Sequence, residues 1–314
     1  MIKIGTKVFT PHDIVLRDDA AHGKGSFSHV ETWYYDAMFD NGYSAVTLVN
    51  VIHVGKIGTI LTGLFIYKDA KLVGNIRNRV SYKRFYGSEE KPLIKLNGQQ
   101  IIKGHVDEDT KTWNYQLSMG DHKQGIDLEL VKITKAWRGK TFLGNWLVIP
   151  RFKINGTIFL DGNVIDVSGE GYHDHNIYPL YAPLVNRGYH FGKIPVDLMN
   201  ITWARVTKNR NNEEIIAVLN KGQEYMSINP RDIRFTVENQ IKDHGKLIPT
   251  AYRLNVKNDI LDLNVKMESL NFHHIKVPAV NYWRHHVRYS GEIQVDSTQK
   301  KIDTVNIMEQ LRFL

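Results

Sequence analysis

The residues best suited to chemistry in this chain form one short run, Gly169-Glu170-Gly171-Tyr172-His173-Asp174-His175-Asn176. The run places two imidazoles, two carboxylates, a phenol and an amide next to one another. Side chains of these types donate and accept protons in enzymes, so the run is a candidate catalytic centre. Which reactions are open to it depends on which of these side chains share a surface.

The local structure around the run is predicted by the turn that precedes it. Leu160-Asp161-Gly162-Asn163-Val164 contains an Asp-Gly pair, which tolerates the positive φ of a tight hairpin turn. The run therefore lies on the returning strand of a β-hairpin, where side chains alternate between faces. Tyr172, Asp174 and Asn176 would share one face, which we expect to look inward, while His173 and His175 would face away.

The rest of the sequence predicts an all-β fold. Short segments of alternating apolar and polar residues recur along the chain, separated by Gly, Asn and Asp, and long amphipathic helices are hard to find. The segments Tyr82 to Lys91 and Ala279 to Arg288 could hold short helices. This pattern is typical of antiparallel barrels or sandwiches rather than of βαβ units.

The second half of the chain repeats the first in outline. An aromatic segment at Gly188-Tyr189-His190-Phe191-Gly192 corresponds to Trp33-Tyr34-Tyr35, and each half is about the size of one small up-and-down barrel. We therefore expect two tandem antiparallel β-barrels with few short helices. The expected domains are residues 1–182, which carry the Tyr-His-Asp-His-Asn strand, and residues 183–314, with a linker between Ile177 and Arg187.

Composition limits the class of protein and of partner. The 314 residues include no cysteine, which excludes disulfides, thiolate nucleophiles and cysteine-based zinc sites. The net charge of +8 comes from 41 basic and 33 acidic residues that are scattered along the sequence, so we expect no nucleic-acid partner. The sequence does not decide whether the protein contacts an anionic membrane surface or which oligomeric state it adopts.

The expected location is the cytoplasm, either free or peripheral to the inner face of the membrane. Met1-Ile2-Lys3-Ile4-Gly5 lacks the apolar segment of a secretory signal. The apolar stretch from Ala45 to Tyr67 resembles a membrane span, but Lys56 lies at its centre, where a charge is costly. Gly55 and Gly58 flank this lysine and indicate a turn between two strands.

Several segments together resemble the hydroxyneurosporene synthase (carotenoid 1,2-hydratase) and AttH-like family. The resemblance covers most of the chain, roughly Glu31 to Glu309, and its most specific part is the Gly-Tyr-His-Asp-His-Asn run. The segments that carry it are Glu31-Thr32-Trp33-Tyr34-Tyr35-Asp36, Pro150 with Gly156, Gly169 to Asn176, Tyr189-His190-Phe191-Gly192, and Glu309. The family also includes hydratases of prenylated phenols and pericyclases of polyene–decalin skeletons.

The chain departs from the family pattern at a few aromatic positions, which would reshape the lining of a pocket. The family usually has Trp where Thr32, Tyr189 and Phe191 stand, and Trp-Gly where Ile177-Tyr178 stands.

The resemblance implies a pair of lipocalin-like barrels, an apolar ligand and an acid at Asp174. Hydration of an isolated alkene needs a protonated acid, and burial in an apolar cavity can keep a carboxyl group protonated. Tyr172 and Asn176 could hold a water or bond to the acid, with His173 and His175 beside it. Aromatic faces could stabilise a cation by cation–π attraction. The expected ligand-binding residues are Glu31, Trp33, Tyr35, Tyr189, Phe191 and Trp203.

The expected activity is therefore that of a hydratase or cyclase acting on an isoprenoid or other apolar polyene. Three alternatives remain open: a non-catalytic binder or carrier of a hydrophobic small molecule, a structural or stress-related protein, and a purely structural hydrogen-bonded cluster. We expect no cofactor and no metal. His173 and His175 could bind zinc only with a third ligand, such as His190, His273 or His274. Arg284 could pair with Glu309.

Overall fold

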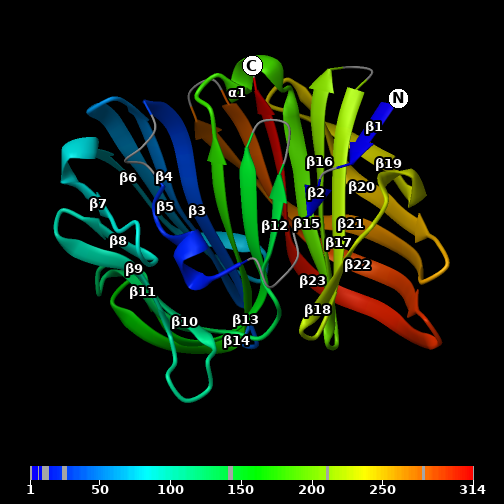
Figure 1. The fold of residues 1–314 in the computed structure, drawn as a ribbon, viewed down its shortest axis with the longest axis horizontal. Helices are drawn as coiled ribbons and strands as arrows, with labels where there is room; N and C mark the ends of the chain where they lie inside the picture. Colours follow the sequence, from blue (N-terminus) through cyan, green and yellow to red (C-terminus); the bar gives the residue numbers. More distant parts are fainter. Residues whose placement is uncertain are drawn as a thin grey trace. The chain divides into compact units, whose positions relative to one another are not determined.

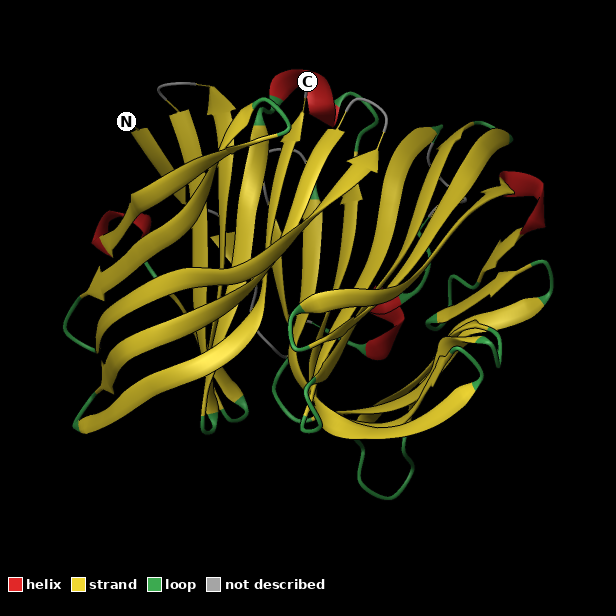
Figure 2. Cartoon of the chain, turned by 180° about the vertical axis from the view of Figure 1, so that it is seen from behind, coloured by secondary structure: helices red, strands yellow, loops and turns green. Residues whose placement is uncertain are grey.

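The computed structural model describes residues 2–5, 7–8, 14–22, 27–140, 144–209, 212–277 and 280–313, and most of them lie in β-strands (Figures 1 and 2). Tight turns join consecutive strands. Residues with positive φ occur at many of these turns, for example Asn97 at 51° and Gly98 at 81°. The chain divides into two compact units, each with its own sheet.

The N-terminal unit consists of Lys7–Ala182 and Gly222–Glu224. Its strands are β2 (Lys7–Val8), β3 (Ser28–Phe39), β4 (Tyr43–Val54), β5 (Ile57–Lys68), β6 (Lys71–Ser81), β7 (Phe85–Gly87), β8 (Leu93–Leu96), β9 (Gln99–Val106), β10 (Trp113–Gly120), β11 (Gln124–Lys132), β12 (Trp137–Lys140), β13 (Asn145–Leu160) and β14 (Asn163–Tyr178). The helices η2 (Leu16–Asp19) and η4 (Tyr82–Arg84) belong to this unit, and α1 (Ala182–Val185) begins at its last residue. All three are very short.

The sheet of the N-terminal unit runs in the order β6-β5-β4-β3-β14-β13-β11-β10-β9-β8-β7, and neighbouring strands are antiparallel. The sheet curves strongly. Tyr35 on β3 and Tyr115 on β10 contact each other, with ring centroids 6.3 Å apart, although three strands separate them in the sheet. Their side chains therefore mark the concave face, which is the interior of this barrel.

The C-terminal unit consists of Met1–Thr6, Pro183–Lys221 and Tyr225–Leu314. Its elements are β1 (Ile2–Gly5), β15 (Gly188–Val196), β16 (Met199–Asn209), β17 (Asn212–Lys221), β18 (Glu224–Ser227), η5 (Pro230–Asp232), β19 (Ile233–Asp243), β20 (Lys246–Lys257), β21 (Leu261–Val277), β22 (Val280–Val295) and β23 (Thr298–Phe313). Its sheet runs β1-β17-β16-β15-β23-β22-β21-β20-β19, with β1 parallel to β17 and the other pairs antiparallel. Trp203 on β16 lies 5.2 Å from Phe235 on β19, which identifies the concave face of this sheet.

The all-β prediction is confirmed, and so is the turn inside the apolar stretch from Ala45 to Tyr67. That stretch lies within β4 and β5, and Gly55 at the turn has a φ of 55°. No helix in the described ranges combines the length and hydropathy that crossing a bilayer requires.

The prediction of two short helices, at Tyr82 to Lys91 and Ala279 to Arg288, was wrong over most of their length. Only Tyr82–Arg84 forms a turn of 3-10 helix, and Ala279 lies outside the described residues. The segment that follows Ala279 is the start of β22, whose residues 282–287 are all buried. A strand buried on both faces loses the alternation that identifies strands, because polar residues no longer mark one side.

Candidate functional site

The run that carries the candidate chemistry lies on β14, the returning strand of the β13–β14 hairpin, as the sequence predicts. Asp161 and Gly162 at the turn have φ values of 52° and 80°. The two strands stay paired along their length apart from an irregularity between Ile149 and Phe152. On its other side β14 pairs with β3, where His173 lies opposite Tyr35 and Asp174 opposite Tyr34.

This register corrects the expected arrangement of faces. Side chains of directly opposed residues lie on the same face of a sheet. The two histidines therefore share the concave face with Glu31, Trp33 and Tyr35, and Asp174 lies on the convex face with Tyr172 and Asn176. The expectation that Glu31 and its neighbours look inward is correct, but the expectation that Asp174 joins them there was wrong.

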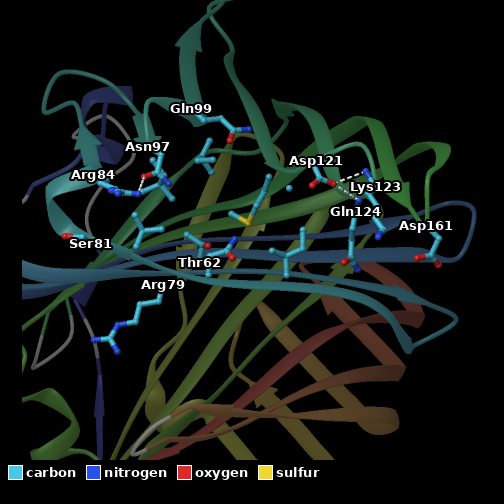
Figure 3. Close-up of a pocket in the computed structure, with 17 residues that line it drawn as sticks. Thr62, Arg79, Ser81, Arg84, Asn97, Gln99, Asp121, Lys123, Gln124 and Asp161 are labelled. Atoms are coloured by element: carbon cyan, nitrogen blue, oxygen red, sulfur yellow. Dashed lines mark hydrogen bonds between the residues drawn. The ribbon is translucent and has the colours of Figure 1, made fainter.

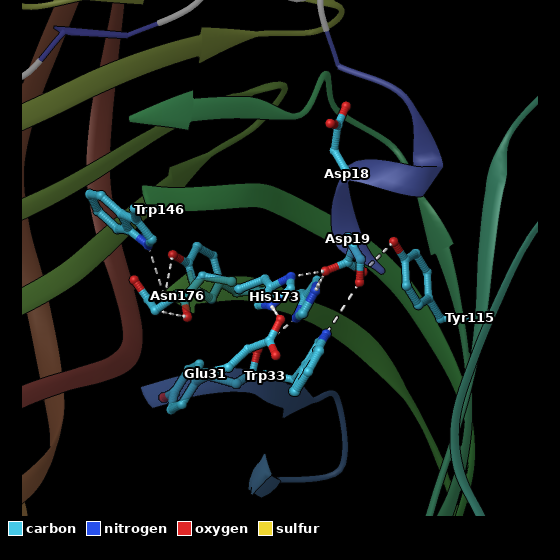
Figure 4. Close-up of polar contacts among 12 residues, drawn as sticks. Asp18, Asp19, Glu31, Trp33, Tyr115, Trp146, His173 and Asn176 are labelled. Atoms are coloured by element: carbon cyan, nitrogen blue, oxygen red, sulfur yellow. Dashed lines mark hydrogen bonds and ion pairs between the residues drawn. The ribbon is translucent and has the colours of Figure 1, made fainter. Parts of the chain in front are cut away.

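The concave face holds a buried network centred on Asp19, at the end of η2 (Figure 4). The Asp19 carboxylate contacts His173 Nε2 at 3.0 Å and His175 Nδ1 at 3.1 Å, and it accepts a hydrogen bond from Tyr115 Oη at 2.8 Å. The Trp33 indole N–H donates to the Asp19 carbonyl oxygen at 3.2 Å. Asp19 and His173 are completely inaccessible to solvent. The network thus fixes the η2 segment inside the barrel.

A second carboxylate extends the network. His175 Nε2 lies 2.9 Å from Glu31 Oε1, which also accepts a hydrogen bond from the backbone N–H of His22 at 2.8 Å. His29 Nε2 lies 3.5 Å from the other Glu31 oxygen, and His29 Nδ1 lies 3.2 Å from His53 Nε2. A continuous path of imidazoles and carboxylates therefore runs from His53 to His173.

The ionisation of this network follows from competition between burial and hydrogen bonding. Burial alone would raise the pKa of Asp19, but the charges and hydrogen bonds of His173 and His175 hold that pKa well below its usual value. Burial opposes ionisation of Glu31 in the same way, yet its contacts with His175 and His29 lower its pKa to about 2. Although burial disfavours an imidazolium, hydrogen bonds to Asp19 and Glu31 raise the pKa of His175 to about 9. His175 is a cation between two anions at neutral pH.

The convex face of β14 carries a different cluster, around Asp174 (Figure 4). Three neutral groups donate to its carboxyl oxygens: Trp146 Nε1 at 3.1 Å, Tyr172 Oη at 2.9 Å and Asn176 Nδ2 at 2.7 Å. Asp174 is 6% exposed and Tyr172 is completely buried. Trp146 comes from β13, where it lies opposite Asn176.

A second carboxyl lies on the same convex face. Asp36 on β3 is opposite Tyr172, and Tyr34 is opposite Asp174, so the two acids are diagonal neighbours. Tyr34 Oη donates to Asp36 Oδ2 at 3.1 Å, and Asp36 is 2% exposed. Burial, followed by the charges of Asp174 and Asp36, raises the pKa of Tyr172 well above its usual value, so its hydroxyl stays protonated.

A cavity of about 870 Å³ opens in the N-terminal unit beside β6 (Figure 3). Apolar side chains such as Ile76, Val80 and Met119 line it together with amides, hydroxyls and the charged side chains of Arg79, Asp121, Lys123 and Asp161. Arg84 donates to Asn97 at one end. Volumes of this size accommodate small ligands. None of the site residues expected from the sequence lines this cavity.

The expected ligand-binding residues of the C-terminal unit divide between two faces. Trp203 lies opposite Gly192 and points to the concave face, where it is 2% exposed. Tyr189 and Phe191 alternate with His190 on β15 and lie on the convex face. The expected ion pair is present, since Arg284 Nε lies 3.2 Å from Glu309 Oε1.

Among the residues that the structure describes, no group of three or more histidines and carboxylates has the arrangement of a metal site. His173 and His175 share a face, and the carboxylates they contact there are those of Asp19 and Glu31.

Sequence reasoning missed Asp19, Tyr115, Trp146 and Asp36. Asp19 lies 154 residues from His173, and no pattern in the sequence connects them. Trp146 could have been found from the hairpin, because pairing outward from the Asp161-Gly162 turn places it opposite Asn176.

Comparison with known proteins shows the fold. No protein-family model matches the chain, and no curated protein matches it. Among solved structures, a protein described as an AttH from Nitrosomonas europaea is similar, with a TM-score of 0.70, 13% identity, and coverage of 95% of this chain and 96% of that one. Kievitone hydratase from Nectria haematococca has a TM-score of 0.57 with 11% identity, covering 93% of each chain. CghA in complex with Sch210972 has a TM-score of 0.61 with 10% identity, covering 91% of this chain and 89% of that one.

These likenesses establish an AttH-like arrangement of lipocalin-like barrels over nearly the whole chain. Hydratase-type enzymes occur among the proteins that share it, as the name of kievitone hydratase states. At such low identity the shared property is the fold, and the reaction must be argued from the side chains.

Proposed function

We propose that this protein is a hydratase- or cyclase-like enzyme that protonates a double bond of an apolar isoprenoid or polyene, with Asp174 as the acid. The observation that carries the proposal is the cluster of Trp146, Tyr172 and Asn176 around one buried carboxyl group. The similarity of the fold to kievitone hydratase supports the same class of reaction.

Opposing influences act on the protonation of Asp174. Burial and Asp36, which lies diagonally across the same face, favour the neutral acid, whereas the three hydrogen bonds that its oxygens accept favour the carboxylate. Two carboxyl groups in one low-dielectric environment disfavour double ionisation, as in paired-carboxylate enzymes. In the proposed mechanism Asp174 carries the one proton of this pair, and the Tyr172 hydroxyl stays protonated because burial raises its pKa well above the usual value.

The proposed step transfers the Asp174 proton to the less substituted carbon of a trisubstituted alkene. The π electrons form the new C–H bond and leave a tertiary cation on the other carbon. In hydration, a water oxygen bonds to the cation and releases a proton, which restores the carboxyl group. In cyclisation, a second double bond attacks the cation, and loss of a proton returns the acid to its starting state.

The neighbours of Asp174 have separate roles in this scheme. The Trp146 ring can stabilise the passing cation by cation–π attraction, which contributes about 2 kcal/mol or more when the site is desolvated. Tyr172 and Asn176 orient the carboxyl group through their hydrogen bonds. They are positioning residues.

The proposal is tested with purified protein and two probes, lycopene and a prenylated phenol, with products followed by mass spectrometry. Hydration adds the mass of one water, and cyclisation changes retention time at constant mass. Asp174→Asn should abolish turnover while keeping the fold. Asp166→Asn is the matched control, because Asp166 is an exposed aspartate on the same strand. An Asp174→Asn variant as active as the wild type would end the proposal.

A second candidate function is a non-catalytic carrier of a hydrophobic small molecule, which the cavity beside β6 favours. In that case lipids should co-purify with the protein, and Met119→Arg, which places a charge in the cavity lining, should remove them. Mass spectrometry of solvent extracts from both proteins distinguishes the functions. A carrier shows bound lipid and no product. An enzyme forms product both as the wild type and as Met119→Arg.

A further inference from the structure

The concave face of the C-terminal unit gathers two arginines and a histidine at one place. His190 on β15 lies opposite Arg205 on β16 and, on its other side, opposite Gln310 on β23. Arg312 follows on the same face of β23, opposite Gly188. The two guanidinium groups therefore lie on the strands that flank His190.

Several buried ring nitrogens in this cluster have no hydrogen-bond partner. Both ring nitrogens of His190 are unpaired although the residue is only 9% exposed. The indole N–H of Trp203 and Nε2 of His285 are also unpaired, and these residues are 2% and 0% exposed. An unsatisfied buried polar group lowers stability, so the presence of such groups on three residues of one face calls for an explanation.

These residues are neighbours in space. The Trp203 ring covers Gly192, where a Cβ atom would lie 3.0 Å from Trp203 Nε1. Gly192 follows His190 on the same face of β15 and pairs with Met308, which in turn lies opposite His285. The unpaired donors therefore belong to one continuous patch of the barrel interior.

The cluster carries an excess of one positive charge. Arg205 pairs with Glu213. The guanidinium of Arg312 makes no ion pair within the described part of the chain, and its Nε and Nη2 donate to the amide oxygen of Gln310 at 3.0 and 3.1 Å. Burial, then the charge of Arg205 and that of Arg312, lower the pKa of His190 to about 3. Burial likewise lowers the pKa of His285 to about 3, so both imidazoles are neutral and each carries one N–H donor.

Aromatic rings line the same patch. The Arg205 guanidinium lies 5.1 Å from the centre of the Phe235 ring, and His190 lies 5.8 Å from the Tyr252 ring in an edge-on arrangement. Phe235 also contacts Tyr252, at 5.3 Å between ring centroids. A ligand anchored at the arginines would meet flat apolar surfaces.

We propose that this patch, formed by His190, Trp203, Arg205, His285 and Arg312, binds a monocarboxylate with a flat apolar body. A guanidinium fork matches the two oxygens of a carboxylate, and neutral N–H donors from the indole and imidazoles complete their coordination. The single excess charge matches a monoanion better than a phosphate dianion. The site lies in the C-terminal unit, so it is independent of the reaction proposed for Asp174.

The test is isothermal titration calorimetry of the full-length protein with benzoate, acetate, benzamide and inorganic phosphate. Benzoate should bind with one-to-one stoichiometry and more tightly than acetate, and its neutral analogue benzamide should not bind. Arg312→Gln should weaken benzoate by at least about tenfold, as expected for loss of a charge-assisted hydrogen bond. Arg288→Gln is the matched control, because Arg288 is an exposed arginine of the same unit that pairs with Asp303.

Arg312→Lys keeps the charge without the fork and should bind benzoate with intermediate affinity, which preserves the test if the Gln variant does not fold. The absence of saturable heat with benzoate up to about 10 mM would overturn the proposal, because a dissociation constant above that concentration is too weak for a functional site. Equal affinity of the wild type and both Arg312 variants, or tighter binding of phosphate than of benzoate, would overturn it as well.

Discussion

The buried network around His175 makes the stability of the N-terminal unit depend on pH in a defined direction. His175 titrates near pH 6.5 in the unfolded chain and at about 9 in the folded protein. The folded state therefore holds a proton that the unfolded state has lost between these two values. This stabilisation is complete below pH 6.5 and disappears as the pH rises through 9.

The size of the effect follows from the shift. Each unit of pKa difference corresponds to about 1.4 kcal/mol, so the imidazolium contributes about 3 kcal/mol to the free energy of unfolding at about pH 6. Between pH 6.5 and 9 the free energy of unfolding should fall by about 1.4 kcal/mol per pH unit. The lowered pKa values of Asp19 and Glu31 arise from the same contacts, so they add no separate contribution to the change in the free energy of unfolding between pH 6.5 and 9.

Urea denaturation monitored by tryptophan fluorescence measures this slope, because Trp33 stacks on His175 with ring centroids 4.4 Å apart. His175→Gln should lower stability at about pH 6 by more than at about pH 9.5, because only at the lower pH does the substitution remove an ion pair. His22→Gln is the control: His22 stacks 5.6 Å from His175 but is exposed. A wild-type protein equally stable at pH 6.5 and 9 would refute the reasoning.

Three further predictions follow from single contacts. Tyr115→Phe keeps the ring but leaves Asp19 without its hydroxyl donor, so the free energy of unfolding should fall by about 1–3 kcal/mol in urea titrations, and an unchanged midpoint would contradict this. Gly171→Ala should destabilise by about 1–3 kcal/mol, because its Cβ would lie 2.3 Å from Ile154 Cδ1 and 2.5 Å from the Asp36 carbonyl oxygen; a neutral result would show that the hairpin can shift. Trp146→Phe should reduce turnover of the alkene substrate more than its binding, and an equal loss in kcat/KM and affinity would argue for a packing role alone.

The sequence predicted the fold through local signals. The Asp161-Gly162 turn has the positive φ angles that such pairs adopt, and it placed the Tyr-His-Asp-His-Asn run on a strand. Gly55 predicted a turn inside the apolar stretch from Ala45 to Tyr67, and the structure has two strands joined by that turn. Both signals act within a few residues, which is why they can be interpreted without knowledge of the tertiary structure.

The site was less predictable because it depends on strand pairing. Alternation correctly separated Asp174 from the two histidines, but only the pairing of β14 with β3 shows that the histidines share the concave face with Glu31. Asp19 reaches that face from η2, far away in the sequence. Contacts between distant segments leave no periodic signal in one sequence.

Deuterium transfer tests the central claim, that the Asp174 carboxyl group protonates a carbon atom of an apolar polyene. In D₂O the wild-type protein should place one deuterium on the less substituted carbon of the former double bond, at a position that NMR of the product identifies. Asp174→Asn should bind the same substrate and form no deuterated product. Product that carries the label in the Asn variant, or wild-type product without deuterium on carbon, would contradict the assignment of Asp174 as the acid.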